Sequence, residues 1–171
     1  MLIVLNRLVF VVVISITAVH AAGAQRNPRP PLKVDRIVVY KKAHTLVLMR
    51  GGKALRSYKV ALGDPFGNKI KAGDRKTPEG QYVIDGMKSR SRFYRALHIS
   101  YPNAADRERA RRLGVNPGGD IEIHGLPKAL TWIGELQHRW DWTSGCIAVT
   151  DKEMDEIWPQ VSVGTPVDIR P

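Results

Sequence analysis

The stretch "DWTSGCIAVT" (141–150) carries the single cysteine of the chain, Cys146, between a turn of small residues and a short apolar run. This pattern is typical of a tight turn that leads into a strand. Such a turn can hold a side chain at the surface beside backbone N–H groups, which is the geometry that acyl transfer needs for its oxyanion. A lone cysteine cannot form an internal disulfide. It is therefore a buried bystander, an intermolecular crosslink or a reactive thiol.

A reactive thiol usually needs a histidine as its base, and "DIEIHGLP" (120–127) offers one. The two isoleucines alternate with Glu122 and His124, which predicts a strand whose less apolar face carries the histidine. Gly125 follows, where the backbone can turn and approach closely. His124 is the leading candidate base. A half-exposed structural histidine is the alternative interpretation.

The other histidines give weaker indications. His44 falls in a predicted turn, which favours a surface position, and His138 falls in a polar run. His98 alternates with apolar residues on a predicted strand, where a structural role and a substrate contact are both open. No HxxxH or CxxC spacing occurs, so we expect no metal site, and we expect no cofactor.

The N-terminus has the pattern of a secretory signal. Arg7 precedes an apolar run (8–19) and the small residues Ala22-Gly23-Ala24, which predicts a signal peptide over 1–24. The run is shorter than the roughly 20 apolar residues of a membrane span, although an uncleaved anchor is the alternative. Cleavage would leave 147 residues. We expect a Pro/Arg-rich leader at 25–33 and one domain over 34–170.

The chain is strongly basic, with 27 Lys and Arg against 16 Asp and Glu and a net charge of +11. This balance indicates anionic surroundings such as phospholipid or cell-wall polymer. Export disfavours nucleic acid as the partner. Solubility alone is the alternative explanation of the charge.

The periodicity predicts a mainly β domain, of the β-rich α+β class, with two short helices. Gly51-Gly52 predicts a hairpin turn. The helices are expected at 103–114 and at 150–159, where Thr150 and Glu153 form a capping-box pattern. The expected strands are 35–42, 45–52, 55–63, 81–85, 96–100, 120–125, 146–149 and 166–170.

Four segments in this order resemble the YkuD-type L,D-transpeptidase catalytic domain family, the cysteine enzymes that crosslink peptidoglycan. They are "GDRKTPEGQYVI" (73–84), the stretch 97–125 that leads into the histidine, "IHG" (123–125) and "TSGCIAVT" (143–150). The resemblance covers about residues 34–170. It implies a YkuD-like β-sandwich and a place in the periplasm or cell envelope of a bacterium.

The resemblance also implies roles for residues. Cys146 would be the nucleophile, His124 the proton donor and acceptor, and the Gly125 carbonyl the group that orients His124. Gly145 and Cys146 would supply oxyanion-hole N–H groups. Thr143 and Ser144 would shape the turn. Thr143, Ser144, Arg139 and His98 are the expected substrate contacts.

Two positions depart from the family pattern. Ser144 stands where many members have histidine, and Ala148 stands where many have an arginine that helps to hold the substrate carboxylate. Arg139, from the preceding loop, is the expected substitute for that cation.

The implied activity is formation of 3→3 crosslinks through a Cys146 thioester, with release of the terminal D-alanine. An L,D-carboxypeptidase, or an enzyme that attaches lipoprotein to peptidoglycan or detaches it, would use the same site, and a basic wall-binding module is the non-enzyme alternative. The expected partners are peptidoglycan stem peptides, or a wall-linked lipoprotein, with no nucleic acid and no stable protein partner. Loop 126–142, with Trp132, Trp140 and Trp142, would be a lid or ordinary packing.

Overall fold

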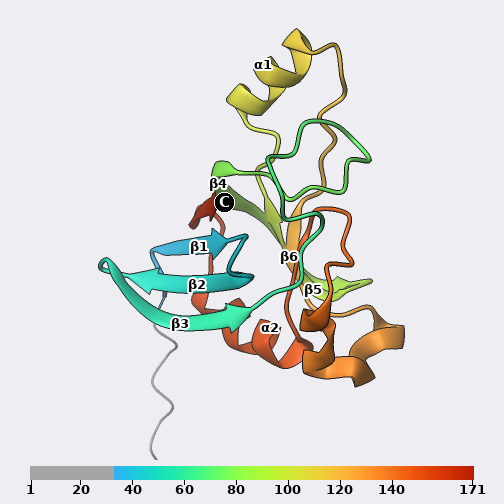
Figure 1. Ribbon diagram of the computed structural model, residues 1–171. Coiled ribbons are helices and arrows are strands. Elements are labelled where there is room, and N and C mark those ends of the chain that lie inside the picture. Colours follow the sequence, from blue (N-terminus) through green and yellow to red (C-terminus); the bar gives the residue numbers. More distant parts are fainter. Residues whose placement is uncertain (1–32) are drawn as a thin grey trace, which may run out of the picture. The chain divides into compact units, whose positions relative to one another are not determined.

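Eight strands form one mixed sheet in the order β3-β2-β1-β8-β4-β5-β6-β7. Figure 1 shows β1, β2 and β3 side by side in one half of it. The structure, a computed structural model, describes residues 33–171. The predicted signal peptide, and the leader up to residue 32, lie outside this range. The strands are β1 (Arg36–Tyr40), β2 (Thr45–Arg50), β3 (Lys53–Lys59), β4 (Gly80–Ser91), β5 (Tyr94–Ile99), β6 (Glu122–His124), β7 (Ile147–Ala148) and β8 (Pro166–Arg170).

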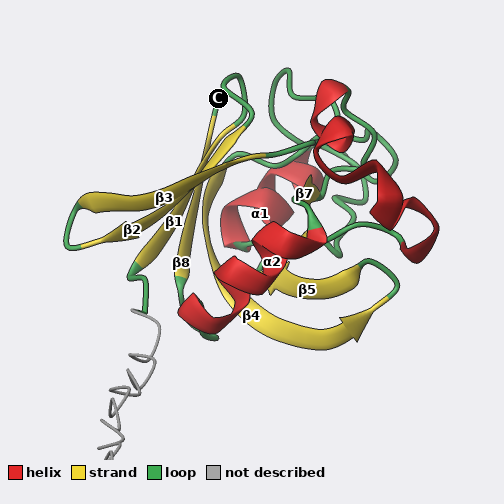
Figure 2. Ribbon diagram, turned by 90° about the horizontal axis from the view of Figure 1, so that it is seen from below, coloured by secondary structure: helices red, strands yellow, loops and turns green. Residues whose placement is uncertain are grey.

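Strand β4 belongs to both halves of the sheet. Its first residues pair with β8 and its later residues pair with β5, with a register shift between Ile84 and Gly86. Figure 2 shows the strand curving from one half to the other. One apolar core joins residues of both halves with residues of the helix that follows β7. The β-rich class predicted from the sequence is confirmed.

The two predicted helices are present. Helix α1 (Ala104–Arg112) begins after the N-cap Asn103, whose capping box uses Asp106. Helix α2 (Asp151–Ile157) begins after Thr150, and Glu153 completes the expected capping box. A short 3₁₀ helix, η2 (Trp158–Gln160), continues from it.

Four segments differ most from the sequence prediction. Strand β3 ends at Lys59, whereas the predicted strand runs to residue 63. Strand β4 runs to Ser91 rather than ending near 85, because its polar end pairs with β5. Strand β6 is shorter than the predicted strand 120–125. The region expected as a loop between 126 and 142 contains a 3₁₀ helix, η1 (Lys128–Arg139), which is interrupted at Gly134, where φ is +48°.

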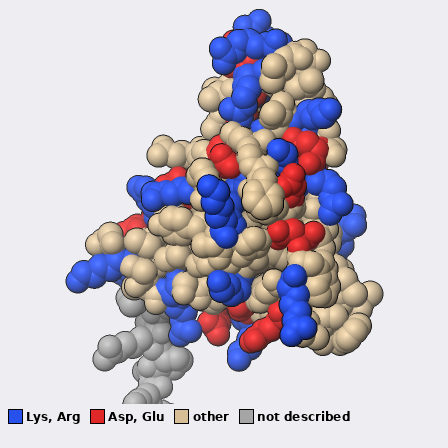
Figure 3. All heavy atoms as spheres, in the orientation of Figure 1, with Lys and Arg blue, Asp and Glu red and all other residues tan. Residues whose placement is uncertain are grey.

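The surface agrees with the basic composition. On the face shown in Figure 3, Lys and Arg side chains are spread widely and cluster over α1, with Asp and Glu among them. Within the described range, no helix has the length and apolar character needed to cross a membrane.

Candidate active site

Cys146 and His124 lie on the same face of two neighbouring parallel strands. Strands β6 and β7 pair Ile123 with Ile147 and His124 with Ala148. The two isoleucines are buried in the core. Because side chains alternate along a strand, His124 and Cys146 are on the opposite face, with Cys146 just before β7 and diagonal to the histidine. We call this face of β5, β6 and β7 the site face.

The turn before Cys146 is closed by Thr143. The Thr143 hydroxyl donates to the Cys146 carbonyl at 2.7 Å, and the Gly145 N–H donates to the same hydroxyl at 3.1 Å. Gly145 has φ +117°, and a Cβ there would lie 2.6 Å from the Lys76 carbonyl oxygen, so only glycine fits. Since its N–H is already paired, the expected oxyanion role of Gly145 is not supported. Thr143 is buried in the turn, while Ser144 is exposed.

The Gly125 carbonyl fixes the tautomer of His124. Nδ1 of the imidazole lies 2.7 Å from the Gly125 carbonyl oxygen. A carbonyl oxygen only accepts, so Nδ1 carries the proton and Nε2 is left as the acceptor. An unprotonated Nε2 is what a general base requires.

His124 is only 1% exposed, rather than half-exposed as a strand-face histidine would be. Phe93 stacks on its ring with centroids 4.4 Å apart, and Trp142 approaches edge-on at 5.9 Å. Burial lowers the pKa of His124, the hydrogen bond to Gly125 opposes that shift, and the charge of Arg92 adds to it. The imidazole is therefore neutral at pH 7.

The Cys146 thiol is also neutral at rest. It donates to the Asp120 carbonyl at 3.5 Å. Burial raises the pKa of Cys146 to about 11, a backbone hydrogen bond from Glu122 opposes this, and the charges of Glu122 and Asp120 raise it further. A resting thiolate–imidazolium pair is thus disfavoured, and the thiol must lose its proton as it reacts.

Buried Gln137 ties η1 to the site. Its Nε2 donates to the Ala148 carbonyl at 3.3 Å, and its Oε1 accepts from the Trp142 indole N–H at 3.1 Å. Trp142, which contacts His124, is therefore held in place. Trp132 and Trp140 are 78% and 52% exposed. Of the three tryptophans, only Trp142 packs against the histidine.

The structure separates the two expected substrate contacts. His98 lies on the site face, where β5 pairs it with Glu122 of β6. Arg139 instead lines a cavity of about 260 Å³ with His44, His138, Trp140 and Asp141. Its suggested role as the replacement cation gains no support from this position.

Phe93, Gln137 and Asp120 all contact the site, yet none stood out in the sequence. Phe93 is at the tip of the β4–β5 hairpin, and the partners of Gln137, Ala148 and Trp142, lie outside its own helix. Of the three, only Asp120 follows a local feature that could have marked it, the pair Gly118-Gly119. Asp120 itself has φ +54°.

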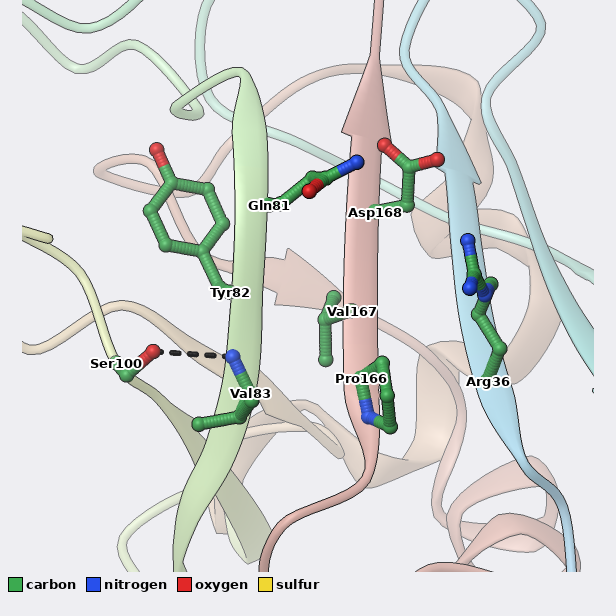
Figure 4. A pocket seen from close by; sticks show the side chains of 8 residues that line it. All are labelled: Arg36, Gln81, Tyr82, Val83, Ser100, Pro166, Val167 and Asp168. Atoms are coloured by element: carbon green, nitrogen blue, oxygen red, sulfur yellow. Dashed lines mark hydrogen bonds between the residues drawn. The ribbon is translucent and has the colours of Figure 1, made fainter. Parts of the chain in front are cut away.

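A separate pocket of about 350 Å³ lies over β1, β8 and β4 (Figure 4). Arg36, Gln81 and Asp168 are among its lining side chains, and it shares no residue with the cysteine and histidine site. Across residues 33–171, no group of three or more His, Cys, Asp or Glu side chains is placed to hold a metal ion.

The domain is thus a curved mixed sheet that carries a cysteine beside one strand and, on the neighbouring strand, a histidine oriented by a backbone carbonyl. The sequence matches the YkuD family, described as the L,D-transpeptidase catalytic domain, over residues 34–169. The chain belongs to this family, as its motifs predicted.

Known relatives agree with this assignment. The chain is 33% identical over 133 residues to "Putative L,D-transpeptidase YafK" of Escherichia coli K12, covering 74% of this chain and 46% of that protein. The crystal structure of the helical cell shape determining protein Pgp2 from Campylobacter jejuni has a TM-score of 0.60 and 25% identity, covering 78% of this chain and 46% of the other. An L,D-transpeptidase from Mycobacterium smegmatis shares the fold, with a TM-score of 0.54 and 18% identity over 80% of this chain and 58% of that one. The chain spans about half the length of the curated relatives that it matches.

Proposed function

We propose that this protein is an exported cysteine L,D-transpeptidase that forms 3→3 peptidoglycan crosslinks through a Cys146 thioester. One observation carries the proposal: Cys146 shares the site face with His124, whose Nδ1–H is held by the Gly125 carbonyl. A nucleophile, a base and a group that orients the base are the three parts of covalent acyl transfer.

The first half-reaction begins from the neutral pair. The thiol turns from the Asp120 carbonyl toward the imidazole, and Nε2 of His124 takes its proton as sulfur attacks the carbonyl carbon of the substrate. The substrate is a stem tetrapeptide, and the attacked carbonyl is that of the L-centre of its diaminoacyl residue. The Cys146 N–H is the donor that we assign to the oxyanion, since the Gly145 N–H is paired with Thr143. His124 then protonates the amine of D-alanine, which leaves as the C–N bond breaks.

In the second half-reaction, a side-chain amine of a neighbouring stem attacks the thioester. A C–N bond forms, the C–S bond breaks and the thiol is restored. The thioester conserves the free energy of the cleaved amide, so the reaction needs no nucleotide. This suits a reaction outside the cytoplasm.

Family membership and charge support the substrate class. L,D-transpeptidase catalytic domains act on peptidoglycan peptides, and the Pgp2 relative is named for its role in cell shape. The net charge of +11 is compatible with anionic wall polymers, as it is with anionic phospholipid. The predicted signal peptide would deliver the protein to the periplasm or cell envelope.

The test is analysis of the muropeptides formed when purified cell walls are incubated with wild type, Cys146→Ala and His124→Gln. We expect 3→3 dimers and free D-alanine from wild type only. His44→Gln is the matched histidine control, because His44 pairs with Asp141 and lies in the β1–β2 turn rather than on β5, β6 or β7. Tripeptides without dimers would identify a carboxypeptidase. Release or attachment of a wall lipoprotein would identify an enzyme that links lipoprotein to peptidoglycan or detaches it. Wall binding without any product, unchanged in Cys146→Ala, would identify a binding module.

A further inference from the structure

We propose that His98, held by Asp85, is a second base on the site face and accepts a proton from the incoming amine in the second half-reaction. This inference rests on the proposed function, because it concerns the acceptor of the thioester. It would make His98 the residue that favours crosslinking over hydrolysis.

The sheet register places His98 beside the reacting groups. Strand β5 pairs His98 with Glu122 and Ala96 with His124. Leu97 and Ile99, which alternate with these residues, are buried in the core. His98 therefore faces the same side as His124 and Cys146.

A β-bulge brings a carboxylate to this histidine. The register shift between Ile84 and Gly86 leaves Asp85 as the extra residue of β4. Its Oδ1 lies 2.5 Å from Nδ1 of His98. Gly86 faces the histidine, and a Cβ there would lie 3.3 Å from the His98 Cβ, so the glycine relieves crowding at the base of the His98 side chain. Bulges often redirect a side chain next to an active site.

The same contact leaves a nitrogen available. An ionised Asp85 can only accept, so Nδ1 of the neutral imidazole carries the proton and Nε2 is a proton acceptor. Nε2 lies 3.8 Å from Asp120 Oδ1, which is beyond hydrogen-bond distance. The Asp120 carbonyl in turn accepts from the Cys146 thiol at 3.5 Å. Asp120 thus lies between His98 and Cys146.

The surrounding charges suit an ammonium group. Asp120 is 96% exposed at its side chain, Asp85 is also exposed, and His98 keeps 25% of its side chain open to solvent. The third nearby carboxylate, Glu122, is already paired with Lys88 at 2.7 Å. Asp85 is likewise paired, with Nδ1 of His98, so Asp120 is the carboxylate that remains to attract a cationic amine to Nε2 of His98.

The proton balance explains why an amine acceptor needs this group and water does not. A protonated amine must lose two protons to become an amide N–H. One returns through His124 to the Cys146 sulfur as the C–S bond breaks, and His98 takes the other and releases it to solvent. Attack by water requires transfer of one proton only, from water through His124 to sulfur.

The experiment separates the two half-reactions in His98→Gln and Asp85→Asn. Acylation is followed as the mass of the Cys146 adduct with no acceptor present, and partition is the ratio of crosslinked dimer to trimmed monomer. We expect acylation and hydrolysis to be unchanged while crosslinking falls by about 100-fold, the usual contribution of a general base. His44→Gln again serves as the control, because it removes a histidine–aspartate pair of the same kind.

A second acceptor tests the chemistry directly. Methoxyamine is largely unprotonated at neutral pH, so it needs no second base, and it should react with the thioester of His98→Gln at nearly the wild-type rate. An equal loss with methoxyamine and with the stem amine, or an equal loss of acylation and crosslinking, would overturn the inference. A wild type that forms no adduct or no dimer would overturn the proposed function itself, whatever the variants do.

Discussion

Phe93 stacks on His124, with ring centroids 4.4 Å apart and ring planes inclined by 23°. The two residues come from the tip of the β4–β5 hairpin and the end of β6. Arg92 lies over the Phe93 ring, 4.8 Å from its centroid. The hairpin tip thus forms a wall of the site and keeps water from the imidazole.

Replacing Phe93 by alanine should raise the pKa of His124 toward the ordinary value, because burial is the main cause of its lowered pKa. We expect a several-fold loss of acylation rate, since the ring also loses its orientation. NMR titration of the imidazole protons and the rate of adduct formation would measure the two effects. Phe66→Ala is the control, because Phe66 is 70% exposed. An unchanged titration would contradict the role of the stack.

The activity of the wild type should fall on the acid side of its pH profile only below pH 6.5. The pKa of His124 lies below the ordinary 6.5, so the base stays unprotonated as pH falls from 7, and activity is lost only near its lowered pKa. In His124→Gln the thiol has no base, and alkylation of Cys146 should increase as pH rises toward about 11. Rates of iodoacetamide labelling across pH would test both. A low-pH plateau of labelling in wild type would instead indicate a thiolate–imidazolium pair.

Gly145→Ala should be far more damaging than Gly164→Ala. Both glycines have positive φ, +117° and +89°, but only Gly145 has backbone within contact distance of a new Cβ. We expect backbone strain in Gly164→Ala to lower the free energy of unfolding by about 1–2 kcal/mol. Gly145→Ala should lower it further and also abolish activity. Urea unfolding of both variants gives the comparison. Equal destabilisation would mean that the Lys76 contact is relieved without cost.

Gln137→Met should loosen η1 without changing the volume of the core. Trp142 then loses the acceptor of its indole N–H, which we expect to cost about 1–3 kcal/mol. The Ala148 carbonyl keeps its bond from the Ala61 N–H at 3.0 Å. Unfolding curves would measure the loss of stability. The dimer-to-monomer ratio would show whether water then reaches the thioester more often. Full stability of the variant would show that the Gln137 bridge is dispensable.

Much of the scaffold was predictable because its signals are local. Gly51 and Gly52, both with positive φ, turn the chain between β2 and β3 as expected. The capping box of Thr150 and Glu153 correctly marked the start of α2. These features depend on residues that are close in the sequence.

The surroundings of the site were not predictable, because they depend on distant contacts. The sequence could not show that Phe93 and Trp142 bury His124, since nothing in either segment marks its partner. The polar end of β4 becomes a strand through pairing with β5, which overrides weak local propensity. Likewise, the hydroxyl of Thr143 takes the Gly145 N–H, a detail of side-chain direction that spacing does not contain.

The division of β4 between the two halves of the sheet has a consequence for protein engineering. One end of the strand is fixed against β8, from Gly80 to Val83, while the other end extends to the hairpin that carries Arg92 and Phe93. A designed library confined to that tip would alter the wall of the site and leave the scaffold's pairing intact. The hairpin tip is therefore the part of the β4–β5 pair that can be varied without disturbing the pairing of β4 with β8.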